Sequence, residues 1–175
     1  FFWDMINYNL LIYEILDRKF QINYWDVNYA EGDLAELSKK LELSETKYPI
    51  IWLQTGYRVV EKKGQLELNG CNFFLITKGD EHDLYKKRYQ TNYQEMLYPL
   101  YDKFKQAISK SKGVSLLNQD ISFVSMPFND VTELNSKGKM AQKATIQDIW
   151  DAIVIEGLNL RIKMDCYSEF KIKKQ

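Results

Sequence analysis

The fold that the sequence predicts is decided by the stretch Leu84–Ile108, which reads LYKKRYQTNYQEMLYPLYDKFKQAI. Apolar side chains recur in it every three or four residues, the spacing of one face of an α-helix. They are Tyr85, Tyr89, Tyr93, Met96, Leu100, Phe104 and Ile108. Polar side chains, many of them lysine and glutamine, fill most other positions, so the stretch predicts a long amphipathic helix. Pro99 lacks an N–H and clashes with the preceding turn, which predicts a kink between Glu95 and Pro99.

Two apolar strands are predicted to lie beneath this helix. Cys71–Ile76 is apolar at most positions, as in a central strand that is covered on both faces. Ile149–Met164 alternates over a longer span, and we expect a bulge at Gly157. The fold class that follows is α+β. We expect a mixed or mostly antiparallel sheet with the long kinked helix and an N-terminal helix, Phe1–Lys19, packed on one face.

Shorter patterns predict the remaining elements. Asp33 followed by Glu36 approximates a capping box and begins a short helix. Gly64 follows two lysines and marks the turn of a hairpin, and Asn69–Gly70 is a plausible bulge within that hairpin. The other expected strands are Phe20–Tyr29, Pro49–Leu53, Tyr57–Lys62, Gln65–Lys78 and Ile121–Met126.

The length of 175 residues suits one domain. We assign residues 1–165 to a single α+β domain. A polar excursion at 129–148 is longer than most loops, which marks it as a functional or mobile segment. Residues 166–175 form a basic tail without a packing pattern.

The composition argues against several classes of protein. Lys plus Arg and Asp plus Glu both number 24, and this balance argues against a dedicated nucleic-acid binder, although a local basic patch stays open. Cys71 and Cys166 lie far apart and the chain has a single histidine, so a disulfide framework and a zinc site are poorly supported. No apolar run has the length of a membrane span. We expect no cofactor and no metal. The 12 Tyr, nine Phe and four Trp fit a core or a subunit interface.

Candidate catalytic residues are few. His82 is the one conventional general base, and it lies in an acidic loop between Asp80 and Asp83. Either the loop holds an acid–base or metal site, or it is the solvated start of the helix. Asp148 and Asp151 could form a carboxylate pair, but a strand edge and turn explain them more simply. Cys71 sits in an apolar strand, which predicts an inert core thiol.

The order of elements resembles that of the tail-terminator or tail-completion proteins of tailed bacteriophages, small α+β ring proteins of the head–tail junction. The resemblance covers most of the chain and rests on element order and apolar runs. It is carried by Phe1–Lys19, by Lys47–Leu53, by Phe73–Ile76 leading through Asp83 into the long helix, and by Asp148–Ile155. The strand and helix between residues 20 and 41 and the excursion make this chain bulkier than a minimal member.

This resemblance implies a structural virion protein without catalysis, assembled in the bacterial host cytoplasm into a homo-oligomeric ring. Its partners would be other neck and tail proteins, with at most non-specific contact to DNA in the channel. Because ring contacts are heterologous, each chain needs two different surfaces. Candidate subunit-interface residues are Trp3, Tyr57, Val59 and Trp150, and candidate contacts to the lumen or a neighbouring ring are Lys137, Lys139 and Lys143. The competing interpretations are a small enzyme or ligand-binding module that uses the His82 loop, and a monomeric binding protein.

Overall fold

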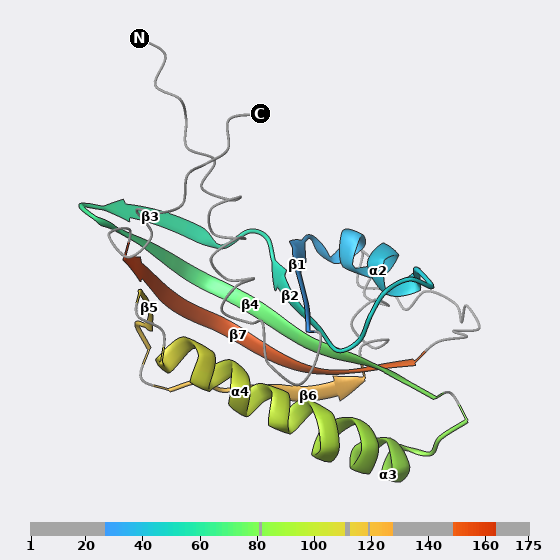
Figure 1. The fold of residues 1–175 in the computed structure, drawn as a ribbon. Helices are drawn as coiled ribbons and strands as arrows, with labels where there is room; N and C mark the ends of the chain where they lie inside the picture. The colour runs from blue at the N-terminus through green and yellow to red at the C-terminus, as the bar shows by residue number, and fades with distance from the viewer. Residues whose placement is uncertain (1–26, 81, 111–112, 119, 128–148, 164–175) are drawn as a thin grey trace.

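The computed structural model describes residues 27–80, 82–110, 113–118, 120–127 and 149–163 (Figure 1). It confirms the α+β class, with a mixed seven-stranded sheet and one long helix. The elements are β1 (Asn28–Gly32), α2 (Leu34–Glu42), β2 (Ile50–Gln54), β3 (Arg58–Lys62), β4 (Gln65–Gly79), α3 (Tyr85–Arg88), the π-helix η1 (Tyr89–Leu97), α4 (Tyr98–Ser109), β5 (Val114–Leu116), β6 (Val124–Pro127) and β7 (Ile149–Lys163).

The sheet is built around β4 and β7, two strands of 15 residues that pair antiparallel over their whole length. On the outer side of β4, β2 pairs with Asn72–Ile76 and β3 pairs with Gln65–Asn69. On the outer side of β7, β6 pairs with Asp151–Val154 and β5 with Leu160–Ile162. The parallel strand β1 extends the sheet beyond β2. The sheet therefore has a half that contains β1, β2 and β6, and a half that contains β3 and β5.

Two compensating bulges separate these halves. Between Leu68 and Cys71 two residues of β4 oppose one of β7, and between Cys71 and Phe73 one residue of β4 opposes two of β7, which restores the register. Gly70 and Gly157 lie at the bulges with φ of +75° and +66°, a conformation that is costly for other residues. Their N–H groups donate to the side chains of Asn159 (2.8 Å) and Asn72 (2.9 Å) on the facing strand. Both bulges predicted from the sequence are thus present.

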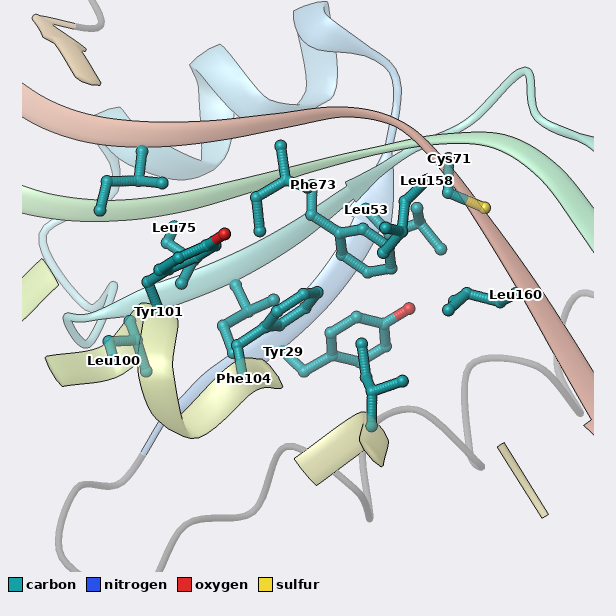
Figure 2. Close-up of a cluster of buried hydrophobic side chains, with 14 of the residues drawn as sticks. Tyr29, Leu53, Cys71, Phe73, Leu75, Leu100, Tyr101, Phe104, Leu158 and Leu160 are labelled. Atoms are coloured by element: carbon teal, nitrogen blue, oxygen red, sulfur yellow. The ribbon is translucent and has the colours of Figure 1, made fainter. Parts of the chain in front are cut away.

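The long helix covers one face of the sheet along both halves. The ring of Phe104 in α4 meets the ring of Phe73 in β4 edge-on, with the ring centroids 5.1 Å apart (Figure 2). The two predicted apolar strands do lie beneath the helix, as expected. The buried side chains of this core include Leu66, Leu68, Cys71, Phe73, Leu75, Tyr93, Leu97, Leu100, Phe104, Ile108, Ile153, Ile155, Leu158, Leu160 and Ile162.

The opposite face is apolar in one half only. There the short helix α2 packs Leu37 and Leu41 against a second core cluster of Ile50, Trp52, Phe74, Ile76, Ala152 and Val154. The predicted capping box is present, because the Asp33 carboxylate accepts from the Glu36 N–H at 2.8 Å and the Glu36 carboxylate accepts from the Asp33 N–H at 2.9 Å. Both faces of the sheet are covered here, which explains why Phe73 and Leu75 on one face and Phe74 and Ile76 on the other are all apolar.

Some boundaries differ from those predicted. The first described strand is Asn28–Gly32, and most of the predicted strand Phe20–Tyr29 and the predicted helix Phe1–Lys19 lie outside the described residues. Strand β5 was not predicted, because three residues carry no readable alternation. Tyr85 was predicted to lie on the apolar face of the long helix but is 58% exposed. Leu97 is fully buried, whereas the sequence placed Met96 on that face. Both shifts occur around η1, where the helix is widened.

The sequence predicts a kink between Glu95 and Pro99, and the structure has a π-helix directly before this proline. Residues 89–97 have π geometry, and Pro99 follows in the first turn of α4. Figure 1 shows α3, η1 and α4 running on as one continuous helix. A π segment is one of the recognised ways in which a helix accommodates a proline or an inserted residue.

Candidate functional site

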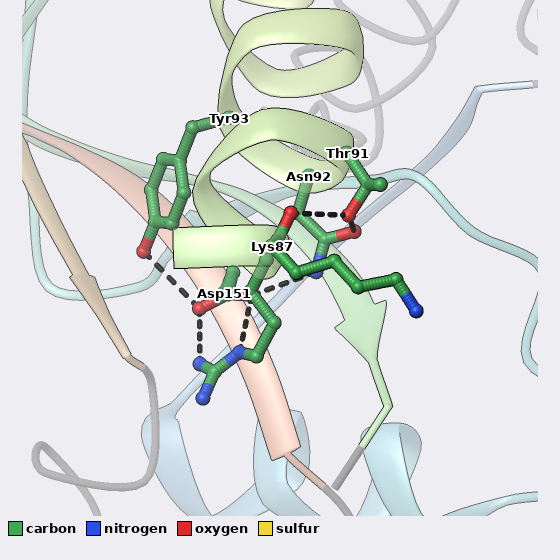
Figure 3. A network of polar contacts seen from close by, with 6 residues as sticks. Lys87, Thr91, Asn92, Tyr93 and Asp151 are labelled. Carbon is green, nitrogen blue, oxygen red and sulfur yellow. Dashed lines mark hydrogen bonds and ion pairs between the residues drawn. The ribbon is translucent and has the colours of Figure 1, made fainter. Parts of the chain in front are cut away.

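A buried polar network joins the start of the long helix to strand β7. Asp151 has no exposed surface, and its carboxylate receives four donors (Figure 3). Arg88 binds both oxygens, with Nε 3.0 Å from Oδ2 and Nη2 on Oδ1. Asn92 donates to Oδ2 at 2.7 Å, and the Tyr93 hydroxyl donates to Oδ1 at 3.3 Å. We call these four residues the Asp151 network.

The electrostatics of the Asp151 network favour a fixed ion pair. The hydrogen bond to Asp151 raises the pKa of Arg88, so the guanidinium stays charged. Burial, together with the nearby Asp151 charge, raises the pKa of Tyr93, so the phenol stays a neutral donor. A carboxylate whose oxygens already accept four hydrogen bonds has little capacity left to take a substrate proton. The arrangement is therefore suited to hold the helix against the sheet.

Sequence reasoning missed the Asp151 network. It interpreted Asp151 as part of a strand edge and turn, whereas the residue lies inside β7 with its side chain fully buried. Arg88, Asn92 and Tyr93 were assigned to the helix without chemistry. A charged residue among the apolar positions of a predicted strand was the available signal, because a buried carboxylate needs a partner. The partner lies 63 residues away in sequence, and spacing alone does not identify it.

The sheet ends in strands whose outer edges have no partner strand among the described residues. Strand β3 lies on the outer side of β4, and β6 lies on the outer side of β7, at the other end of the two long strands. Val59 on β3 is 36% exposed, and Val124 on β6 is 47% exposed. An unpaired strand edge offers free N–H and C=O groups to another chain. These edges differ in sequence and face opposite sides of the molecule.

A row of aromatic rings runs along the long helix toward β6. Successive ring centroids are 6.2 Å apart from Tyr85 to Tyr89, 6.1 Å from Tyr89 to Tyr98 and 6.0 Å from Tyr98 to Phe123. We call these four residues the aromatic row. Tyr85 and Phe123, at its two ends, are exposed. Phe123 directly precedes β6, so the row ends beside an unpaired strand edge.

An open groove of about 540 Å³ lies at the other end of the helix. Residues of α4 and of the segment that joins β5 to β6 line it, and the Tyr101 hydroxyl donates to the Ile121 carbonyl at 3.2 Å. Lys105 and Asp102 pair with each other at 2.9 Å. Nothing in the groove indicates a particular ligand.

The predicted interface residues are dispersed over the molecule. Tyr57 is partly buried against the core beneath the long helix, and burial, followed by the charges of Glu31 and Cys71, raises its pKa. Val59 lies exposed on the β3 edge. Trp150 is the second residue of β7 and donates from Nε1 to the Tyr48 hydroxyl at 2.9 Å. Trp3, Lys137, Lys139 and Lys143 lie outside the described residues, and all of these interface assignments stay predictions.

The loop around His82 has the geometry of a helix start. The His82 backbone N–H donates to the Asp80 carboxylate at 2.9 Å, and Asp83 pairs with Lys87 at 2.6 Å. Over the part of the chain that the structure describes, no three His, Cys, Asp or Glu side chains are grouped to hold a metal. Cys71 is fully buried, and burial raises the pKa of its thiol to about 12. It is protonated at neutral pH, as an inert core thiol would be.

Comparison with known proteins returned no matching family model and no similar curated protein. Among the described residues, none of the helices has the length and apolar character needed to cross a membrane.

Proposed function

We propose that this chain is a structural subunit of a tailed bacteriophage that assembles into a homo-oligomeric ring at the head–tail junction or in the tail, with no catalysis. The proposal begins from the resemblance in element order. In this proposal the ring forms in the bacterial host cytoplasm, becomes part of the virion and contacts other neck and tail proteins. Residues Lys137, Lys139 and Lys143 would contact the lumen, with its DNA, or a neighbouring ring.

The observation that best supports the proposal is that one chain carries different unpaired strand edges among the described residues. A head-to-tail contact requires two different surfaces on one chain. Strands β3 and β6 are two such edges on opposite sides of the β4–β7 pair, and each carries an exposed valine. In the proposed ring the β3 edge of one subunit faces the β6 edge of the next. The predicted helix at residues 1–19, with Trp3, would add to this contact.

Charge substitutions on the two edges test the proposal. A lysine on an edge strand opposes pairing with another strand. We expect the wild-type chain at high concentration to have a mass that is a fixed multiple of 20.8 kDa, with rings in negative-stain micrographs. Val59→Lys and Val124→Lys should each give monomers. The measurement is sedimentation velocity across a concentration series, followed by microscopy.

Leu43→Lys is the matched control. Leu43 is 47% exposed, the same as Val124, but it is the C-cap residue of α2 and belongs to neither edge strand. This variant should keep the wild-type mass. A wild-type chain that stays monomeric at every concentration, or edge variants that assemble as well as Leu43→Lys, would contradict the proposal.

The enzyme or ligand-binding alternative makes a different prediction. If the His82 loop carried chemistry, His82→Ala would abolish function without changing the assembly mass. The ring proposal expects His82→Ala to leave both mass and particle infectivity unchanged. A plaque assay with the complemented phage separates these outcomes.

A further inference from the structure

The π-helix η1 changes which side chains share a face of the long helix. At its start, the Tyr89 N–H reaches the carbonyls of Lys86 and Tyr85, as in an ordinary helix. At its end, the Tyr98 N–H reaches the Tyr93 carbonyl, five residues back. This five-residue step is the mark of a π-helix and places more residues in each turn than an α-helix holds.

The aromatic row depends on this wider turn. Tyr89 and Tyr98 are nine residues apart, and nine residues make about two and a half turns of an α-helix, which would put the two rings on opposite faces. Their centroids are instead 6.1 Å apart. In the same way, Arg88 and Tyr93 are five residues apart and still contact one carboxylate. The first contact requires a helix that is wider than α, and the second fits such a helix.

Two features could hold residues 89–97 in this conformation. Pro99 disfavours an ordinary turn just before it, since its ring clashes with the carbonyl four residues back. The Asp151 network ties Arg88, Asn92 and Tyr93 to strand β7. The proline explains why some irregularity occurs near residue 95. It does not specify that Tyr93 must turn toward β7, whereas the hydrogen bond to Asp151 does.

We propose that the Asp151 network sets the register of the long helix, holding residues 89–97 as a π-helix and thereby building the aromatic row beside β6. Beyond η1, Leu100, Phe104 and Ile108 fix α4 in the core. The helix is thus fixed in rotation at both ends, and η1 takes up the mismatch between them. Buried ionic groups are best attested in this role, as devices that specify register. The inference does not depend on the proposed ring.

The test replaces the ionic groups with apolar ones of similar size, in the variant Arg88→Met/Tyr93→Phe/Asp151→Leu. This change leaves no buried charge unpaired, and Asn92 is partly exposed and can bind water. We expect the variant to fold with residues 89–97 in an α register. The NOE between the Tyr89 and Tyr98 rings, present in the wild type, should be lost, and the Tyr98 amide should bond to Gln94 instead of Tyr93.

The matched control is Asp83→Leu/Lys87→Met, which removes an exposed ion pair from the same end of the helix. The control should keep the NOE between Tyr89 and Tyr98. Pro99→Ala should keep it as well. A triple variant that retains this NOE overturns the proposal. If Pro99→Ala also loses the NOE, that pair of results assigns the register to the proline.

If the triple variant does not fold, Asp151→Asn tests the proposal. This substitution keeps the shape of the side chain but removes the charge that holds Arg88. We expect amide exchange at Tyr93–Leu97 to rise about tenfold relative to Phe104 in α4, as local opening of this segment becomes easier. The control here is Asp102→Asn, on the exposed face of α4. Equal exchange of the two segments in Asp151→Asn would overturn the proposal.

Discussion

The two halves of the sheet share β4 and β7 but differ in what covers them. In the half with β1, β2 and β6, both faces are apolar, and α2 and the long helix lie on opposite sides. In the half with β3 and β5, the face under the long helix is apolar, and the other face carries Glu67 paired with Lys62 (2.6 Å) and Arg161 (3.2 Å). The compensating bulges mark the boundary between them.

Because their faces are covered differently, the two halves should contribute unequally to the stability of the fold. The half with two apolar faces removes more surface from water, so it should contribute most of the hydrophobic free energy. The half with β3 should contribute less hydrophobic free energy, and it presents an edge strand with exposed side chains. The proposed ring takes one edge from each half, β3 from this half and β6 from the half with two apolar faces.

The comparison is tested most sharply by truncating one side chain in each half, on the same face of the sheet. Leu37→Ala in α2 should lower the free energy of unfolding by about 2–5 kcal/mol, because a fully buried side chain leaves a cavity. Val60→Ala in β3 lies on the same face as Glu67 and should cost less than about 1 kcal/mol. Urea denaturation measures both. Equal losses would remove the distinction between the halves.

The boundary between the halves is tested by its glycines. Gly70→Ala and Gly157→Ala should each cost about 1–2 kcal/mol, because an alanine disfavours positive φ. A steric clash does not add to this loss, since a Cβ at either position meets nothing within 4 Å. Thermal unfolding gives the two losses. Substitution without effect would show that the bulges relax freely and do not define a boundary.

The smallest expected effect concerns the polar face. The hydrogen bond from Lys62, aided by Arg161, holds the pKa of Glu67 below its ordinary value of 4.5. The folded state therefore binds a proton less readily than the unfolded state, so the contribution of Glu67 to stability is present above that value and is lost as the pH falls below it. In Glu67→Gln, unfolding free energy measured against pH should fall less steeply on the acid side. A fall as steep as that of the wild type would contradict the pairing.

Much of the fold follows from local patterns in the sequence. The spacing from Tyr85 to Ile108 predicted the helix, and the apolar run Cys71–Ile76 predicted the central strand, because both depend on patterns along the chain. The Asp151 network was not predicted, since its residues meet across 63 positions and three of them share a face only in a π-helix. The unpaired edges were predicted in part: the β3 edge follows from the hairpin, whereas β6 depends on long-range pairing with β7.

The most direct test of the proposed assembly is to mix the two edge variants and measure the mass. Val59→Lys keeps an intact β6 edge, and Val124→Lys keeps an intact β3 edge, so one head-to-tail contact can form between them and no second contact can extend it. Sedimentation of the equimolar mixture should give a dimer of twice 20.8 kDa, while each variant alone is a monomer. A mixture that stays monomeric, or that forms full rings, would contradict the account.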